Sequence, residues 1–400
     1  MKRIHELITP IVLCALSCSL FACEDEDPAT TPPAMAGEMA GEMAGEMAGE
    51  MAGEMAGEMA GETAGEMAGE MAGEMAGEMA GEEVSCERPE TDYPSEAWPM
   101  CISDDGVYEL AGANTPSSAA RVAAYELIGD LLWRNANPSS EDFIQAELIY
   151  GEDGGVGSRV TRRYDAHLPK PEGADCALDE AADQWPDYCV GPARIEPLIL
   201  DAFAAGIAGD EPLANAARVR AGLLWFFYLS VYKEAYSCAG KAADCDSHWA
   251  YHNGAKQRDE EALGLGGEIR SASEDAYNTI FDAHLAVRCW READSAEVSE
   301  DPELHAQVLD QLDRALNHGY ALMIVKLGRA LEATPEDVVT RVTLSIVGPT
   351  LSRAVAEADS SLDVSAWESV WSQLAALDQP VEVAPLSELI AHIATRFACP

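Results

Sequence analysis

Basic residues are scarce in this chain. Its 400 residues include 25 Lys and Arg against 71 Asp and Glu, a formal net charge of −46 at pH 7. Beyond residue 83 the numbers are still 23 against 53, so the deficit is not confined to one segment. A surface this acidic repels nucleic-acid phosphates and anionic lipid headgroups. We therefore expect no nucleic-acid partner and no direct adsorption of the acidic part to a membrane surface.

Catalytic motifs are also missing. The chain has no Gly-x-Ser-x-Gly nucleophile elbow and no His-Glu-x-x-His or Glu-x-x-His metal motif. It has no Cys-x-x-Cys pair, which argues against a finger-like zinc site and against covalent haem. The glycines of 264–267 lack the Lys and Ser/Thr of a phosphate loop, so we expect a turn there. These absences favour a protein that is not an enzyme.

A leader-like segment stands at the N-terminus. Lys2 and Arg3 precede a short apolar run from Ile8 to Leu20. The run is too short to span a bilayer and has the form of a cleaved export signal. The sequence therefore predicts that the protein leaves the cytoplasm.

The residues that end this leader are Leu-Phe-Ala-Cys at 20–23. They resemble the lipobox of bacterial lipoproteins. The resemblance implies a signal peptide over 1–22 and acyl chains, palmitate among them, on Cys23, which anchor a protein stably in a lipid bilayer. Glu24 is not the aspartate that retains lipoproteins in the inner membrane. The resemblance thus implies the cell envelope, with the outer membrane favoured.

Low-complexity sequence fills the next segment, 23–83. Twelve Met-Ala-Gly-Glu tetrads run from Met35 to Glu82, broken only by Thr63. Glycine at every fourth position costs a helix about 1 kcal/mol each, and glutamates four apart repel one another. We expect a disordered, extended tether with a mean span of about 40–45 Å, which acts as a spacer. An oxidant sink of methionines and diffuse cation binding by the glutamates are the alternatives.

Cysteine usage gives independent support for export. After the leader and Cys23 an even number of cysteines remains, as expected of disulfides in an oxidising compartment. The eight are Cys86, Cys101, Cys176, Cys189, Cys238, Cys245, Cys289 and Cys399. The shortest loops predict the pairs Cys86–Cys101, Cys176–Cys189 and Cys238–Cys245, which leaves Cys289–Cys399.

Beyond an irregular, Pro-rich lead-in at 84–114, a helical ectodomain is expected over 115–400. Asn137 with Pro138, and Thr334 with Pro335, are predicted helix starts. The fold class predicted is all-α, with about ten helices in one large or two joined antiparallel bundles, or alternatively an (α/α) toroid. Apolar residues recur with a helical period over 119–134, 137–150, 195–207, 213–236, 273–292, 303–332, 335–358, 365–377 and 385–397.

The densest polar and aromatic stretch lies between positions 233 and 254. His248 and His252 are four residues apart, so on a helix both imidazoles share one face and can reach one divalent metal ion. Carboxylates of this stretch and the next long helix can complete such a site. The candidate metal ligands are Glu234, Asp246, His248, His252, Asp282 and His284. A structural role for the stretch, or contact with a ligand or glycan, is the alternative.

A second candidate site is the only basic cluster. Arg159, Arg162 and Arg163 lie close together in a Gly-rich segment, and guanidinium groups either pair with carboxylates or bind anionic ligands. Trp249 and Tyr251 are candidate ligand contacts of the neighbouring polar stretch. Pairing of these arginines with carboxylates of the protein and binding of an anionic ligand are both alternatives for this cluster.

The layout as a whole is a lipobox, a tether and a helical ectodomain. It is similar to that of imelysin-like bacterial surface lipoproteins, which are helical and linked with iron uptake. Their Gly-x-His-x-x-Glu motif is absent here, so the similarity implies no site residues. The sequence favours a membrane-anchored helical binding domain whose ligand is an unknown protein, glycan or cation. A metal-binding uptake component, or a metal- or carboxylate-dependent hydrolase, is the alternative.

Overall fold

The computed structural model describes residues 88–400 apart from 96–97, 99–100, 153–154, 293–300 and 359–363. In this part every regular element is helical and none is a strand, which confirms the all-α prediction. The predicted signal peptide, Cys23, the repeat tether and Cys86 lie outside the described residues.

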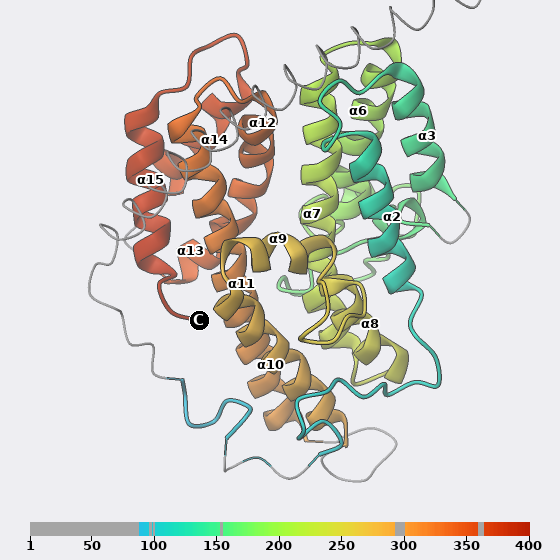
Figure 1. Cartoon of the computed structure of the whole chain (residues 1–400). Coiled ribbons are helices and arrows are strands. Elements are labelled where there is room, and N and C mark those ends of the chain that lie inside the picture. The colour runs from blue at the N-terminus through green and yellow to red at the C-terminus, as the bar shows by residue number, and fades with distance from the viewer. Residues whose placement is uncertain (1–87, 96–97, 99–100, 153–154, 293–300, 359–363) are drawn as a thin grey trace, which may run out of the picture. The chain divides into compact units, whose positions relative to one another are not determined.

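The helices follow one another with mostly short connections (Figure 1). They are α2 Ser118–Leu131, α3 Ser140–Gly151, α4 Gly157–Val160, α5 Ala181–Gln184, η1 Gly191–Ile195, α6 Glu196–Ala208, α7 Pro212–Ser237, α8 Ala242–Asn253, α9 Gly264–Ala272, α10 Glu274–Glu292, α11 Pro302–Ala333, α12 Val338–Val347, η2 Gly348–Leu351, α13 Ser352–Ala358, α14 Val364–Ala375 and α15 Val383–Arg396.

Helix α7 is the central element of the unit Val84–Pro400. Its apolar residues face in nearly every direction, and Leu223, Leu224, Phe226 and Phe227 are all fully buried. A helix that is apolar on all sides needs neighbours on all sides. Helices α6, α8 and α12 supply them. None of the helices in the described part is both long and apolar enough to cross a membrane.

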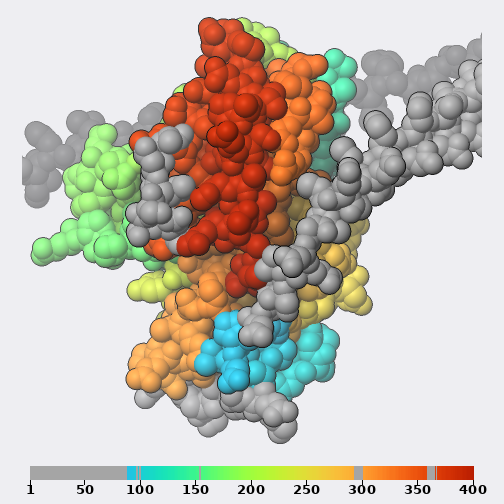
Figure 2. Space-filling view, turned by 90° about the vertical axis from the view of Figure 1, so that its left-hand side faces the viewer, coloured from blue at the N-terminus to red at the C-terminus, as the bar shows by residue number. Residues whose placement is uncertain are grey.

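The 32-residue helix α11 organises the second half of the unit. It packs against α9, α10 and α15, while α12 packs against both α7 and α14. Figure 1 shows α11 to α15 on one side and α2, α3, α6 and α7 on the other, with α8 to α10 below. In Figure 2 the C-terminal helices, in red, cover the face turned to the viewer. The contact of α12 with α7 joins the two sides.

Two predicted helix starts are wrong because stronger capping residues follow. Helix α3 begins after Ser139, which forms a reciprocal capping box with Asp142, rather than at Asn137. Helix α12 begins after Asp337, whose carboxylate accepts two backbone N–H groups, rather than after Thr334. Each of these caps satisfies free N–H groups at the helix end, which stabilises that starting point.

Two further differences concern glycine and proline. The predicted helix 335–358 is interrupted by η2, where Pro349 lacks the N–H that a continuous helix requires. The predicted turn at 264–267 is instead the first turn of α9. Gly266 is required there by close approach, because a Cβ atom would lie 2.9 Å from the backbone carbonyl oxygen of His252 on α8. The glycines of this segment serve helix packing.

Disulfides fasten the described part at several points. The predicted pairs Cys176–Cys189 and Cys238–Cys245 are confirmed. The pairs Cys86–Cys101 and Cys289–Cys399 are wrong, because Cys101 is bonded to Cys289 on α10 over a separation of 188 residues. Cys399 is disulfide-bonded as well. The shortest-loop criterion failed because the entropy of loop closure grows only slowly with loop length.

The lead-in lies against α10 and α11, which explains the long-range disulfide. In Figure 2 the blue lead-in covers part of these orange helices. Gln311 on α11 accepts a hydrogen bond from the backbone N–H of Tyr93 at 3.0 Å and donates to its carbonyl at 2.7 Å. Arg314 binds both carboxylate oxygens of Asp92 at 2.7 and 2.8 Å. The lead-in is thus an ordered part of the unit.

Candidate metal centre

Helices α8 and α10 bring three histidines together. The Cys238–Cys245 disulfide ties the end of α7 to the first turn of α8, and so fixes the position of α8. His248 and His252 lie one turn apart on α8, and His284 faces them from α10. The predicted grouping of the three imidazoles is therefore present.

His284 is the shared neighbour of the other two rings. Its ring centroid lies 4.7 Å from that of His248 and 4.8 Å from that of His252. Tyr108 stands edge-on to His248, and Tyr277 stacks on His252. All three histidines have 0% exposure, so aromatic rings and helix backbone enclose them completely.

Most nitrogens of these imidazoles lack hydrogen-bond partners. Both nitrogens of His252, both nitrogens of His284 and Nε2 of His248 are buried and make no hydrogen bond. His248 Nδ1 pairs with the backbone carbonyl of Cys245, and the backbone of His284 also acts to raise the pKa of His248. A buried polar group without a partner costs about 1–3 kcal/mol, so five such atoms in one place are unusual in a native core.

Burial keeps these histidines uncharged. It lowers the pKa of His248 to about 4 and that of His252 to about 3, and holds the pKa of His284 well below its ordinary 6.5. Repulsion among the rings lowers the pKa of His252 and His284 further. Neutral imidazole is the form that binds metal ions, and it prevails here at any pH near 7.

Among the described residues, one group of three His, Cys, Asp or Glu side chains has a ligand atom from each within 4.8 Å of the others. It comprises Cys101, Asp104 and Cys289. The two cysteines share a disulfide and so offer no thiolate. The three histidines do not meet this distance, and a site made of all three requires a ring to turn.

The predicted carboxylate ligands lie elsewhere, each held by its own partners. Glu234 forms ion pairs with Arg163 at 3.0 Å and Lys233 at 2.9 Å, which hold its pKa below the usual value although burial alone would raise it. Asp246 accepts hydrogen bonds from the backbone of 111–112 in the lead-in. Asp282 pairs with two arginines. These are Arg88 and Arg258.

The predicted ligand contacts are mostly core residues. Trp249 stacks on Tyr108 at 4.3 Å and is 4% exposed, and Tyr251 is 2% exposed. Arg163 is buried beneath Tyr251 and paired with Glu234. Tyr251 and Arg163 therefore form no surface rim, whereas Trp249 lines a surface pocket together with Tyr108. Of the arginine cluster, Arg159 is half-buried and Arg162 is exposed.

A second histidine environment escaped the sequence analysis. His167 lies between two carboxylates, with Nδ1 2.7 Å from Asp165 and Nε2 3.0 Å from Asp313. Arg353 also pairs with Asp313, and the ring stacks on Tyr232 with centroids 3.9 Å apart. Burial alone would lower the pKa of His167, but the two carboxylates raise it above 6.5. Asp165 and His167 are two residues apart in sequence, whereas Asp313 is 146 residues from His167 and gives no local signal.

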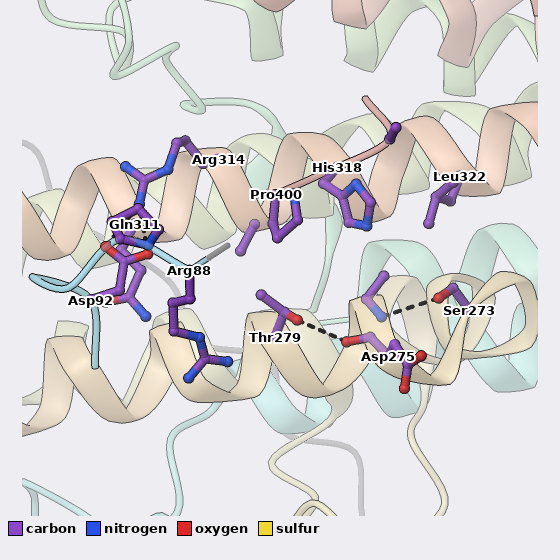
Figure 3. A pocket seen from close by; sticks show the side chains of 14 residues that line it. Arg88, Asp92, Ser273, Asp275, Thr279, Gln311, Arg314, His318, Leu322 and Pro400 are labelled. Atoms are coloured by element: carbon purple, nitrogen blue, oxygen red, sulfur yellow. Dashed lines mark hydrogen bonds and ion pairs between the residues drawn. The ribbon is translucent and has the colours of Figure 1, made fainter. Parts of the chain in front are cut away.

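A crevice of about 390 Å³ lies between α10 and α11 beneath the chain's C-terminus (Figure 3). Several of its polar groups already have partners: His318 Nδ1 pairs with the carbonyl of Phe397 at 2.7 Å, and Arg88 binds Asp282. The crevice is a seam that fastens the lead-in and the C-terminal residues to the helices.

No protein-family model matches the chain, and neither a curated protein nor a solved structure is detectably similar to it.

Proposed function

We propose that this chain is an exported, lipid-anchored helical binding protein that retains a transition-metal ion in its core through His248, His252 and His284. The leader and lipobox support anchoring at Cys23, with the Met-Ala-Gly-Glu segment as tether. The disulfides of the described part are typical of an oxidising compartment outside the cytoplasm.

The observation that carries the metal proposal is the set of five unpaired imidazole nitrogens. Leaving them unpaired is costly, and apolar side chains of similar volume would avoid the cost. A metal ion takes the one lone pair of each neutral imidazole, the form that burial maintains here, and so engages three of the five nitrogens. Imidazole ligands suit zinc, copper, nickel and iron.

The ring spacing agrees with shared coordination. Two imidazoles bonded to one ion at about 2.1 Å, at angles of about 90–110°, place their centroids about 4.5–5.3 Å apart. The pairs His248–His284 and His252–His284 have 4.7 and 4.8 Å. Binding by all three needs at least one ring to turn about its side-chain torsions, because the three rings do not bring a nitrogen each within 4.8 Å of one another.

Complete burial decides between the two metal roles. A catalytic ion needs an open coordination position and a route for substrate. The three rings have no exposed surface, so an ion held there is closed to substrate and exchanges only when α8 and α10 separate. We therefore assign the ion a stabilising role and disfavour a hydrolase at this place.

Elemental analysis of the full-length protein, purified from membranes, tests the proposal. We expect about one transition-metal ion per chain, lost in His284→Leu and kept in the matched control His392→Gln, whose half-buried ring lies on α15. Circular dichroism checks that each variant is folded. A folded wild-type protein without stoichiometric metal after dialysis against Zn²⁺, Cu²⁺ and Ni²⁺ would contradict the proposal.

A further inference from the structure

A second cavity, of about 610 Å³, opens on the surface beside the loop that follows α4. Its lining comprises Arg162, Tyr164, 166–170, 174–177, Tyr188 and Tyr236. Arg162 belongs to the basic cluster that the sequence analysis names as a candidate anion site. The lining combines aromatic rings with basic side chains, which is unusual in so acidic a protein.

The walls of the cavity are rigid. The Cys176–Cys189 disulfide closes the loop, and Tyr164 stacks on Tyr188 with centroids 5.2 Å apart. The backbone N–H of Asp165 donates to the carbonyl of Tyr188 at 2.9 Å. A ligand that binds here meets a preformed surface, which lowers the entropic cost of binding.

His167 holds one wall to the helical core. Its hydrogen bonds to Asp165 and Asp313 join the loop to α11, and its side chain is only 4% exposed. Both ring nitrogens face these carboxylates, so the protonated form of His167 is balanced within the network and adds no net charge to the cavity.

Two cations of the lining are not balanced in this way. In the part of the chain that the structure describes, neither the guanidinium of Arg162 nor the ammonium of Lys170 has an ion-pair partner, and both are exposed. Lys233, by contrast, lies over Tyr164 and pairs with Glu234. Asp175 is the one carboxylate on the lining, and it caps the backbone N–H of Ala177.

Tyr236 supplies an aromatic face at the rim. It stands at the end of α7 and is 52% exposed, the rare case here of a large ring left open to solvent. Flat or ring-shaped ligands stack on such faces, and arginine and lysine beside them bind carboxylate or phosphate groups.

We infer that this cavity binds a small anion that carries a ring, with the ring on Tyr236 and the anionic group on Arg162 and Lys170. The chemistry is shared by acidic monosaccharides and by aryl carboxylates. The inference does not depend on the histidine cluster, since no residue of that cluster lines the cavity.

Isothermal titration of the full-length protein with D-glucuronate and with 4-hydroxybenzoate tests the inference and separates the two sources. Glucose, phenol and inorganic phosphate serve as controls for the ring and the charge alone. We expect binding of at least one ring-bearing anion, weakened about tenfold or more in Tyr236→Ala and in Arg162→Gln. All these positions are exposed, so the fold is retained.

Lys241→Gln, an exposed lysine outside the cavity, is the matched control and should bind as the wild type does. Binding of glucuronate alone assigns the cavity to acidic sugars, and binding of 4-hydroxybenzoate alone assigns it to aryl acids. Binding of inorganic phosphate alone, or ring-anion binding that Tyr236→Ala and Arg162→Gln leave intact, would overturn the inference. Adding a chelator should leave binding unchanged.

Discussion

Two histidine environments of this molecule accommodate buried imidazole rings in opposite ways. His167 has a raised pKa, and both of its nitrogens face carboxylates. His284 and its two neighbours are neutral, and nearly all of their nitrogens have no partner. Buried polar groups are tolerated only when paired. The first site is therefore complete within the chain, whereas the second calls for a component from outside it.

The largest expected effect comes from breaking the complete site. Asp313→Ala removes one partner of His167 and of Arg353. Removal of one partner from a buried ion pair typically costs 3–5 kcal/mol, so we expect a loss of about that size. Urea denaturation measures it. A loss below about 1 kcal/mol would show that the ion pairs of Asp313 contribute little to stability. It would contradict the contrast between the two histidine environments.

Removal of one disulfide at a time should affect the histidine cluster and the Tyr236 cavity separately. Replacing Cys238 and Cys245 by Ala frees the start of α8, with an expected loss of about 2 kcal/mol from the short loop, and replacing Cys176 and Cys189 costs about 3 kcal/mol. The first pair should lower metal content and spare ligand binding at the Tyr236 cavity. Replacement of Cys176 and Cys189 should weaken ligand binding at the Tyr236 cavity and leave the metal content unchanged. Loss of both properties in either variant would contradict their independence.

In metal-free protein His284→Leu should raise the free energy of unfolding, whereas the preceding substitutions lower it. Leucine has a similar volume and removes two unpaired nitrogens, so we expect a gain of about 1–2 kcal/mol in chelator. With metal present the order reverses, because an ion at a hundredfold excess over its dissociation constant adds about 2.7 kcal/mol to the wild type only. Thermal unfolding with and without chelator measures both. His392→Gln should respond to the chelator as the wild type does.

Stability should also change with pH, in opposite directions at the two histidine environments. The cluster histidines have lowered folded-state pKa values, so in metal-free protein their contribution is complete above pH 6.5 and is lost as pH falls toward 4. His167 has a raised pKa, so its contribution is complete below 6.5 and is lost as pH rises through the folded-state value. Each histidine contributes a slope of at most about 1.4 kcal/mol per pH unit.

Variants assign these slopes. His252→Leu should flatten the decline between pH 6.5 and 4, and His167→Gln should flatten the decline on the alkaline side. Urea titrations at a series of pH values give both. A slope that both variants leave unchanged would have to come from other groups, and the opposite protonation of the two sites would then be wrong.

The sequence predicts what is local. The long apolar patterns of α7 and α11 mark helices whatever their partners, and the spacing of His248 and His252 places both rings on one face. Local pattern also misled at 264–267, because glycines that serve close helix packing look the same in sequence as glycines of a turn.

Long-range pairing could not be predicted. Asp282 is a predicted metal ligand, but its carboxylate forms ion pairs with Arg88 of the lead-in and with Arg258. Cys101 meets Cys289 for the same reason, since the lead-in folds back onto α10. The Tyr236 cavity also depends on tertiary contacts, although Arg162 and the Cys176–Cys189 loop were visible signals near it.

X-ray absorption at the edge of the bound metal tests the central claim most directly. For the full-length protein we predict a shell of imidazole nitrogens at about 2.0–2.1 Å, with an amide oxygen in place of one nitrogen in His284→Gln, which unlike His284→Leu keeps a ligand atom for the ion. A shell of oxygen or sulfur ligands alone, or a spectrum that His284→Gln leaves unchanged, would contradict a metal centre at these three histidines.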